Sequence, residues 1–197
     1  MQNIFDCLVN SFLEDGVGVV DNFLNDALAI RLRENLSELK EENRLSEAGI
    51  GNNAKLIADK SRRRDKIFWL DRKHNKPAEN EFLDHIDEFV SYLNSTCYTG
   101  ITGYEFHYAL YEPGAFYKRH LDQFKDNRRR AFSMITYLNE NWKEADGGKL
   151  CVYHEDREQL IEPISGKCVF FRSSQMEHEV LVSHQPRMSV TGWLKTN

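Results

Sequence analysis

The feature that most constrains the fold of this chain is a change of pattern after Gly100. Up to that residue, apolar side chains mostly recur at helical spacing; beyond it, short apolar segments alternate with turns. These segments predict strands over residues 104–111, 116–122, 131–138, 149–154, 166–171, 178–182 and 188–194. Closely spaced antiparallel strands of this kind close into a sandwich, a barrel or a jelly roll. The second half of the chain is therefore expected to form a β-rich core.

Three amphipathic helices are expected before this core. The first covers residues 3–14, the second follows Asn25 as its N-cap, and the third is expected to begin after Asn80. Because the helices come first and the strands last, we expect the helices to cover one outer face of the sheet. That arrangement allows outward positions such as Phe132 and Met134 to be apolar.

Two further elements are expected between the second and third helices. Residues 41–61 are mostly polar and are interpreted as a loop. Residues 64–70 have charged flanks around an apolar centre and are predicted to form a short strand.

Composition excludes several classes of protein. With 197 residues, 41% hydrophobic and 29% charged, the chain resembles an ordinary globular protein. A net charge of -5 argues against a nucleic-acid-binding surface, which would be basic. No apolar run approaches the roughly 20 residues of a membrane span, and the N-terminus has no secretory pattern. The four cysteines stand far apart, as in a reducing compartment. We therefore expect a cytoplasmic protein without a membrane partner.

Three residues of the predicted core have the side chains of a metal site. His120 and Asp122 stand two apart in a predicted strand, so both should point to the same side of the sheet. His178 opens a later apolar segment and supplies a second imidazole. Two histidines and one carboxylate form the facial triad of non-haem iron(II) sites, which leaves positions on the metal open for chemistry. A simpler interpretation is a β-sandwich with two partly exposed histidines and a surface arginine.

An arginine that could bind an anion follows these residues. Arg187 opens a predicted strand in which Ser189, Thr191 and Trp193 share its face. A guanidinium presents a planar pair of donors that matches a carboxylate, and the small hydroxyl groups beside it suit such a pocket. Iron(II) together with this arginine would suit a 2-oxo acid such as 2-oxoglutarate. The residues thus support the hypothesis of an iron(II)/2-oxoglutarate-dependent oxygenase.

Several segments in the same order resemble the prolyl 4-hydroxylase branch of those oxygenases, close to the oxygen-sensing prolyl hydroxylases and their bacterial relatives. The matching segments are 65–69 (DKIFW), 111–114 (YEPG), 117–122 (YKRHLD), 137–139 (YLN), 147–150 (GGKL) and the spacing from His178 to Arg187. One departure is Glu112, which stands between Tyr111 and Pro113, where the oxygen-sensing members have tyrosine followed directly by proline.

The resemblance implies roles for the matched residues. The implied iron ligands are His120, Asp122 and His178. Arg187 would bind the far carboxylate of 2-oxoglutarate. The implied residues that would assist it around the cosubstrate are Tyr137, Thr191, Tyr111 and the apolar wall residues Leu150, Ile135 and Val180. The residues expected to border the substrate are Trp193, Arg64 and Trp69.

The resemblance also implies a fold: mainly β, with a double-stranded β-helix core (jelly roll, cupin-like) buttressed by N-terminal helices. We expect residues 1–197 to form a single domain. Within it, residues 1–99 would provide the helical support and the strand near the substrate, and residues 100–197 the catalytic core.

The implied activity is that of a dioxygenase of the procollagen-proline or peptidyl-prolyl 4-hydroxylase type. It would hydroxylate a prolyl residue of a protein while converting 2-oxoglutarate and O2 to succinate and CO2, with ascorbate as reductant. A translation factor or ribosomal protein is a candidate substrate by family analogy. One alternative is a 2-oxoglutarate oxygenase that acts on a small molecule or free amino acid. A second is a non-catalytic metal-binding jelly-roll module, which would not need Arg187.

Overall fold

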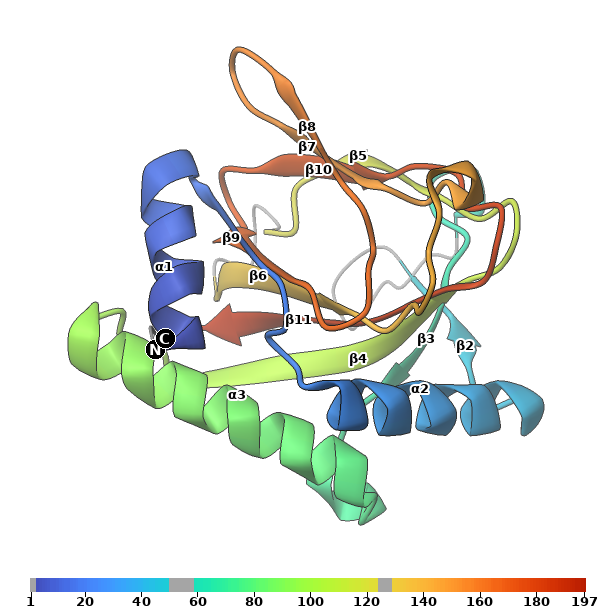
Figure 1. Ribbon diagram of the computed structural model, residues 1–197, viewed down its shortest axis with the longest axis horizontal. Helices are drawn as coiled ribbons and strands as arrows, with labels where there is room; N and C mark the ends of the chain where they lie inside the picture. The colour runs from blue at the N-terminus through green and yellow to red at the C-terminus, as the bar shows by residue number, and fades with distance from the viewer. Residues whose placement is uncertain (1–2, 50–58, 124–128) are drawn as a thin grey trace.

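The computed structural model of the chain describes residues 3–49, 59–123 and 129–197, which form two β-sheets and three α-helices (Figure 1). The helices are α1 (Ile4–Asp15), α2 (Asp26–Glu41) and α3 (Pro77–Thr96), with short 3-10 helices η1 (Arg72–His74) and η2 (Glu144–Asp146). The strands are β1 (Val17–Val20), β2 (Ser46–Glu47), β3 (Lys66–Trp69), β4 (Gly103–Tyr111), β5 (Tyr117–His120), β6 (Arg130–Tyr137), β7 (Leu150–Tyr153), β8 (Glu158–Ile161), β9 (Cys168–Arg172), β10 (Glu177–Val180) and β11 (Arg187–Lys195).

The strands form a seven-stranded and a four-stranded sheet, here called the major and the minor sheet. Strand order is β1-β9-β6-β11-β4-β3-β2 in the major sheet and β5-β10-β7-β8 in the minor sheet. Every pair of named strands is antiparallel. In Figure 1 the minor sheet lies above the major sheet, with α2 and α3 below both. This is the double-stranded β-helix that the resemblance implied, and the predicted fold class is confirmed.

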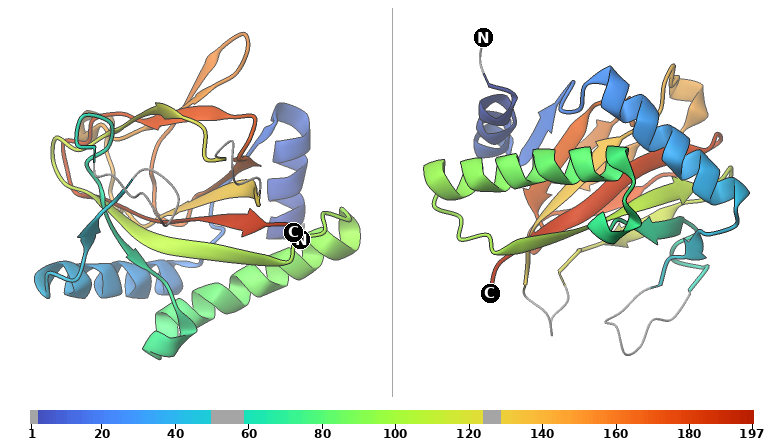
Figure 2. Two further views of the ribbon diagram at one scale, coloured as in Figure 1. Left: turned by 180° about the vertical axis from the view of Figure 1, so that it is seen from behind. Right: turned by 90° about the horizontal axis from the view of Figure 1, so that it is seen from below.

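The core has two layers, one on each face of the major sheet. On the outer face, side chains of the three helices pack against Phe106, Phe132, Met134 and Phe170. Figure 2 shows α2 and α3 lying across this face when the molecule is seen from below. Phe132 and Met134 are therefore apolar for the expected reason: they face outward from the sheet, and the helices cover them. On the inner face, apolar side chains of both sheets meet in a second, smaller cluster, which includes Ile135, Tyr137, Leu150, Val152 and Val180.

The first two helices begin where the sequence predicts, but the third does not. The Asn25 side chain accepts a hydrogen bond from the Leu28 N–H at 2.9 Å and caps α2. Helix α3 instead begins at Pro77, so that Asn80 lies in its first turn and the predicted cap is wrong. Proline suits the first helical position because it lacks an N–H that would otherwise have no partner there. Within the described segments, no helix has the length and apolar character needed to cross a bilayer.

The predicted strands all have counterparts, but two short strands were missed. Strand β2 lies within the predicted loop over residues 41–61, of which residues 50–58 lie outside the described part of the chain. Strand β8 pairs with β7 and is largely exposed, so its sequence carries little apolar signal. The strand predicted at residues 64–70 is the shorter β3 and extends the major sheet beside β4.

Candidate active site

A cavity of about 230 Å³ lies between the two sheets and is called the central cavity here. The major sheet contributes residues from β2, β3, β4, β6 and β11, and the minor sheet from β5, β7 and β10. The predicted site residues that line it are Tyr111, His120, Asp122, Leu150, His178, Arg187, Thr191, Trp193 and Trp69. Tyr137 lies fully buried beside Arg187, and Arg64 lies elsewhere.

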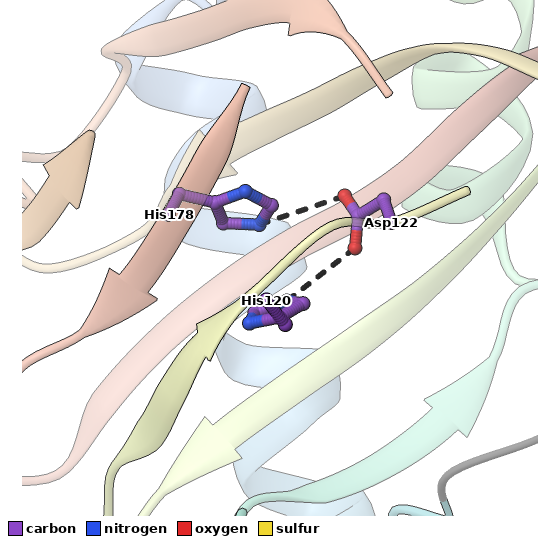
Figure 3. A group of neighbouring side chains, drawn as sticks. All are labelled: His120, Asp122 and His178. Carbon is purple, nitrogen blue, oxygen red and sulfur yellow. Dashed lines mark ion pairs between the residues drawn. The ribbon is translucent and has the colours of Figure 1, made fainter. Parts of the chain in front are cut away.

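His120, Asp122 and His178 converge at one place in this cavity (Figure 3). His120 and His178 are cross-strand neighbours on β5 and β10, and Asp122 follows β5 directly. The two carboxylate oxygens of Asp122 lie 3.5 Å from His120 Nε2 and 3.6 Å from His178 Nε2. One ligand atom from each residue lies within 4.8 Å of the other two, so the three could hold one metal ion.

Backbone contacts determine which imidazole nitrogens face the metal position. His120 Nδ1 lies 2.7 Å from the Lys118 carbonyl oxygen, and His178 Nδ1 lies 3.0 Å from that of Met176. A carbonyl only accepts hydrogen bonds, so Nδ1 carries the proton in both rings. The lone pair of each Nε2 is therefore directed toward Asp122, as a metal ligand requires.

Asp122 is held by a buried hydroxyl group. Ser133 Oγ on β6 donates to Asp122 Oδ2 at 2.6 Å, and Ser173 Oγ lies 2.8 Å beyond it. Burial raises the pKa of Asp122, but the imidazoles of His178 and His120 and the Ser133 hydroxyl outweigh it and hold the pKa well below its usual value. Burial lowers the pKa of His178 to about 4. At neutral pH the site thus presents the neutral imidazole of His178 and the Asp122 carboxylate, the protonation states in which these two residues bind metal.

Two side chains stack in series on the His120 imidazole: first the Tyr117 ring and then the Arg63 guanidinium. The Tyr117 ring lies parallel to the His120 imidazole, with centroids 3.6 Å apart. The Arg63 guanidinium covers the Tyr117 ring at 4.2 Å and donates two hydrogen bonds, of 2.8 and 2.6 Å, to the buried Asp65 carboxylate. In the sequence Arg63 belongs to a basic run that resembles solvated surface, whereas in the structure its bidentate ion pair fixes the ring that packs on His120.

Arg187 lies deeper in the cavity and is 1% exposed. Its Nε donates to the Gly148 carbonyl at 2.8 Å, whereas Nη2 is buried and has no hydrogen-bond partner among the described residues. The hydroxyl of Tyr137 has none either. Within the same segments, no carboxylate forms an ion pair with Arg187. A buried, unpaired cation is costly, so this corner of the cavity suits an anion such as the far carboxylate of 2-oxoglutarate.

The surroundings of Arg187 fit the same ligand. Burial raises the pKa of Tyr137 to about 12, so its hydroxyl remains a hydrogen-bond donor. The Thr191 hydroxyl lies 3.1 Å from that of Ser189 on the cavity side of β11. Ile135, Leu150 and Val180 supply apolar walls, as predicted.

The mouth of the cavity contains two indole rings. Trp69 on β3 is 45% exposed and Trp193 on β11 is buried, with their ring centroids 6.4 Å apart. The Arg130 guanidinium covers the Trp193 ring at 3.4 Å. Arg64 is exposed and lines a separate hollow beside Glu112, so the structure does not bring it together with the other site residues.

The fold and this site define a class of protein: a jelly-roll protein with a two-histidine, one-carboxylate metal position and a buried arginine for an anion. The sequence profile described as the 2OG-Fe(II) oxygenase superfamily matches residues 106–195. The chain belongs to this superfamily, and it has strong structural similarity to prolyl hydroxylases. The family implies iron(II) and 2-oxoglutarate, and the three side chains that could hold a metal, together with the unpaired Arg187, fit both.

Three solved structures illustrate this relationship. A prolyl-4-hydroxylase from Pseudomonas putida is 33% identical, with 98% of this chain and 99% of that chain covered and a TM-score of 0.88. A Trichoplax adhaerens prolyl hydroxylase, in complex with a peptide fragment of the hypoxia inducible factor oxygen degradation domain, is 25% identical, with coverages of 97% and 88% and a TM-score of 0.86. Phytophthora capsici prolyl 4-hydroxylases are 22% identical, with coverages of 98% and 64% and a TM-score of 0.78, and show the same fold.

Proposed function

We propose that this oxygenase is a prolyl 4-hydroxylase that acts on a proline within a protein. The observation that supports the proposal most is the similarity to the Pseudomonas putida prolyl-4-hydroxylase, which extends over nearly the whole of both chains. The peptide bound to the Trichoplax adhaerens enzyme favours a polypeptide substrate. The overall reaction would convert 2-oxoglutarate and O2 to succinate and CO2 and leave a hydroxyl group on the proline.

His120, Asp122 and His178 would hold iron(II) through one atom each. Iron with 2-oxoglutarate and O2 supplies the oxidising power for an unactivated C–H bond, which no side chain provides. The protein keeps the ligands in place: the Lys118 and Met176 carbonyls orient the imidazoles, and Ser133 orients the carboxylate. Three protein ligands leave room on the metal for cosubstrate and O2.

Arg187 would bind the far carboxylate of 2-oxoglutarate. Its guanidinium remains charged at working pH, and the hydroxyls of Tyr137 and Thr191 would donate to the same carboxylate. Tyr111 on the neighbouring strand β4 packs against Arg187 and would border the metal end of the cosubstrate. The walls, which include Leu150, exclude water from the reacting centre.

The substrate proline would enter between Trp69 and Trp193. An indole offers a rigid apolar surface at low entropic cost, which suits the pyrrolidine ring. Arg64 lies outside the cavity, so it would contact only a substrate larger than the cavity, such as a protein. Translation factors and ribosomal proteins are the first candidates to test.

The direct test is incubation of the protein with iron(II), 2-oxoglutarate, ascorbate and a panel of proline-containing proteins and peptides, with free L-proline as a further sample. We expect succinate to form in step with the gain of one oxygen atom on a proline, located by mass spectrometry. His178→Ala should abolish both signals. His154→Ala makes the same replacement in the turn between β7 and β8, outside the central cavity, and should leave both signals in place.

Succinate formation with free proline or another small molecule, and no oxygen on any protein or peptide, would contradict the proposed substrate class. Full turnover by a folded His178→Ala variant would contradict the assignment of the metal ligands.

A further inference from the structure

Two polar atoms on side chains that line the central cavity have no part in the proposed metal and 2-oxoglutarate sites. They are Nε2 of His107, on β4, and Nε1 of Trp193, on β11. Both residues line the cavity and are nearly buried, at 3% and 7% exposed. Their ring centroids lie 5.6 Å apart, and the ring of Trp69 meets His107 edge-on at 5.1 Å. The two rings thus lie together with Trp69 on the wall of the cavity that holds the metal position.

One of these atoms accepts a hydrogen bond and the other donates one. His107 Nδ1 lies 3.0 Å from the Tyr108 carbonyl oxygen, so Nδ1 carries the proton and Nε2 is left as an acceptor. Burial lowers the pKa of His107 to about 4, so the ring is neutral at neutral pH. An indole N–H can only donate. Trp193 Nε1 is buried and has no partner in the described segments.

The charged groups at the mouth are already neutralised. Apart from the metal triad and Arg187, the ionised side chains on the described cavity wall are Glu47, Arg63, Asp65 and Arg130. Arg63 and Asp65 pair with each other, Glu47 pairs with Lys60, and Arg130 pairs with Glu105. A free amino acid would bring an ammonium and a carboxylate into this region, where each described ion already has a partner. Burying such charges unpaired is costly.

We infer that His107 and Trp193 bind the main chain of a peptide substrate beside the target residue, with His107 Nε2 accepting an amide N–H and Trp193 Nε1 donating to a carbonyl. A peptide amide is neutral and offers one donor and one acceptor, so it satisfies both atoms without adding charge. A proline inside a chain has no N–H, so the N–H bound by His107 belongs to a neighbouring residue. This inference rests on the proposed function and makes His107 a residue that selects peptides over free amino acids.

The test replaces single N–H groups of the substrate by N–CH3. The probe is the proline peptide most strongly hydroxylated in the panel assay, made as a series with one methylated amide each. Affinity is measured by calorimetry with redox-inert zinc(II) in place of iron(II), so that binding is observed without turnover. In the wild-type protein, methylation of one amide next to the proline should weaken binding about tenfold, the loss of roughly one hydrogen bond.

The decisive comparison is with His107→Phe, which keeps an aromatic ring in contact with both tryptophans and removes the acceptor. This variant should bind the unmodified peptide about tenfold more weakly and show no further loss on methylation of that amide. His107→Gln, which retains an acceptor, should recover part of the affinity. His154→Phe, outside the cavity, should keep the wild-type pattern. If His107→Phe does not fold, Trp193→Phe removes the donor and should also weaken binding of the unmodified peptide.

Two results would overturn the inference, and they differ in what else they affect. If methylation weakens binding equally in the wild-type and His107→Phe proteins, His107 does not bind the main chain, and the proposed function stands. If free proline is hydroxylated and no peptide is, the proposed substrate class fails and the inference fails with it.

Discussion

At the scale of single residues, the proposed metal site includes a hydroxyl group that contacts one of its three expected ligands. Ser133 Oγ donates to Asp122 at 2.6 Å and is fully buried, so the carboxylate has a fixed orientation before any metal arrives. Groups that orient metal ligands typically affect metal affinity about 10- to 100-fold.

Ser133→Ala should therefore weaken manganese(II) binding by at least about tenfold without unfolding the protein. Ser133→Thr, which keeps the hydroxyl, should recover most of the affinity. Titration followed by electron paramagnetic resonance measures both. Equal affinities for the wild-type and Ser133→Ala proteins would show that Asp122 needs no such support.

The buried histidines also predict a pH dependence of stability. Burial lowers the pKa of both His107 and His178 to about 4, from about 6.5 in an unfolded chain. Between these values the unfolded chain binds protons that the folded protein does not, so stability falls as the pH falls. Above pH about 6.5 these residues add no pH dependence.

Urea unfolding of the metal-free protein at pH 5 and pH 7.5 tests this. The free energy of unfolding should be lower at pH 5 by about 2 kcal/mol for each of the two histidines. In His107→Phe the difference between the two free energies should be smaller by the contribution of one histidine. A difference as large as that of the wild-type protein would mean that His107 is protonated in the folded state.

Single residues were predictable where the signal is local. His120, Asp122 and Arg187 could be found because the alternation of a strand and the chemistry of the side chains are both visible in the sequence. Ser133 lies two residues before Ile135 on the same inward face of β6. The alternation of the strand places its hydroxyl inside, but it does not indicate which group the hydroxyl contacts. The ring stack of Tyr117 on His120 depends on tertiary packing, which no local pattern records.

At the scale of elements, the close contact between β11 and β4 allows a direct test of how the strands pack. Gly192 lies between Thr191 and Trp193 on β11, and a Cβ there would come within 2.2 Å of the Glu105 carbonyl and 2.3 Å of the Phe106 ring. Only a glycine allows this approach, and the nearby residues Thr191, Trp193 and His107 line the central cavity.

Gly192→Ala should consequently destabilise the protein by about 3 kcal/mol or more, because backbone must move to relieve the overlap. Gly103→Ala, at the start of β4, is the matched control, since a Cβ there meets nothing within 4 Å. Thermal unfolding compares the two variants. A Gly192→Ala protein as stable as Gly103→Ala would show that the strands are not packed as described.

Elements were predictable to the extent that they are long and amphipathic. Helix α2 and the strands around the site followed from apolar spacing and from Asn25. The start of α3 was wrong because Pro77 as a first helical residue competes with Asn80 as a cap. Strand β8 was missed because its exposed residues owe their conformation to pairing with β7.

At the scale of the whole molecule, the site joins the two sheets. His120 and His178 belong to the minor sheet and Arg187 to the major sheet, so a metal-bound 2-oxoglutarate that reaches Arg187 spans the space between them. Binding should therefore stabilise the complete fold and not one element.

When 2-oxoglutarate is added at a hundred times its Kd to the manganese(II)-loaded protein, it should raise the free energy of unfolding by about 2.7 kcal/mol beyond the effect of the metal alone. Thermal shift assays measure this. Arg187→Lys lacks the planar pair of donors and should need a higher 2-oxoglutarate concentration for the same shift. An unchanged concentration dependence would remove Arg187 from the cosubstrate site.

The central claim is that three side chains hold one metal ion while Arg187 binds the opposite end of the cosubstrate. A crystal structure of the protein with manganese(II) and 2-oxoglutarate tests it most directly. We predict the metal bound to Nε2 of His120, Nε2 of His178 and the Asp122 carboxylate, with the far carboxylate of 2-oxoglutarate on Arg187 and Tyr137. A metal ion bound elsewhere, or a cosubstrate carboxylate out of reach of Arg187, would contradict the account.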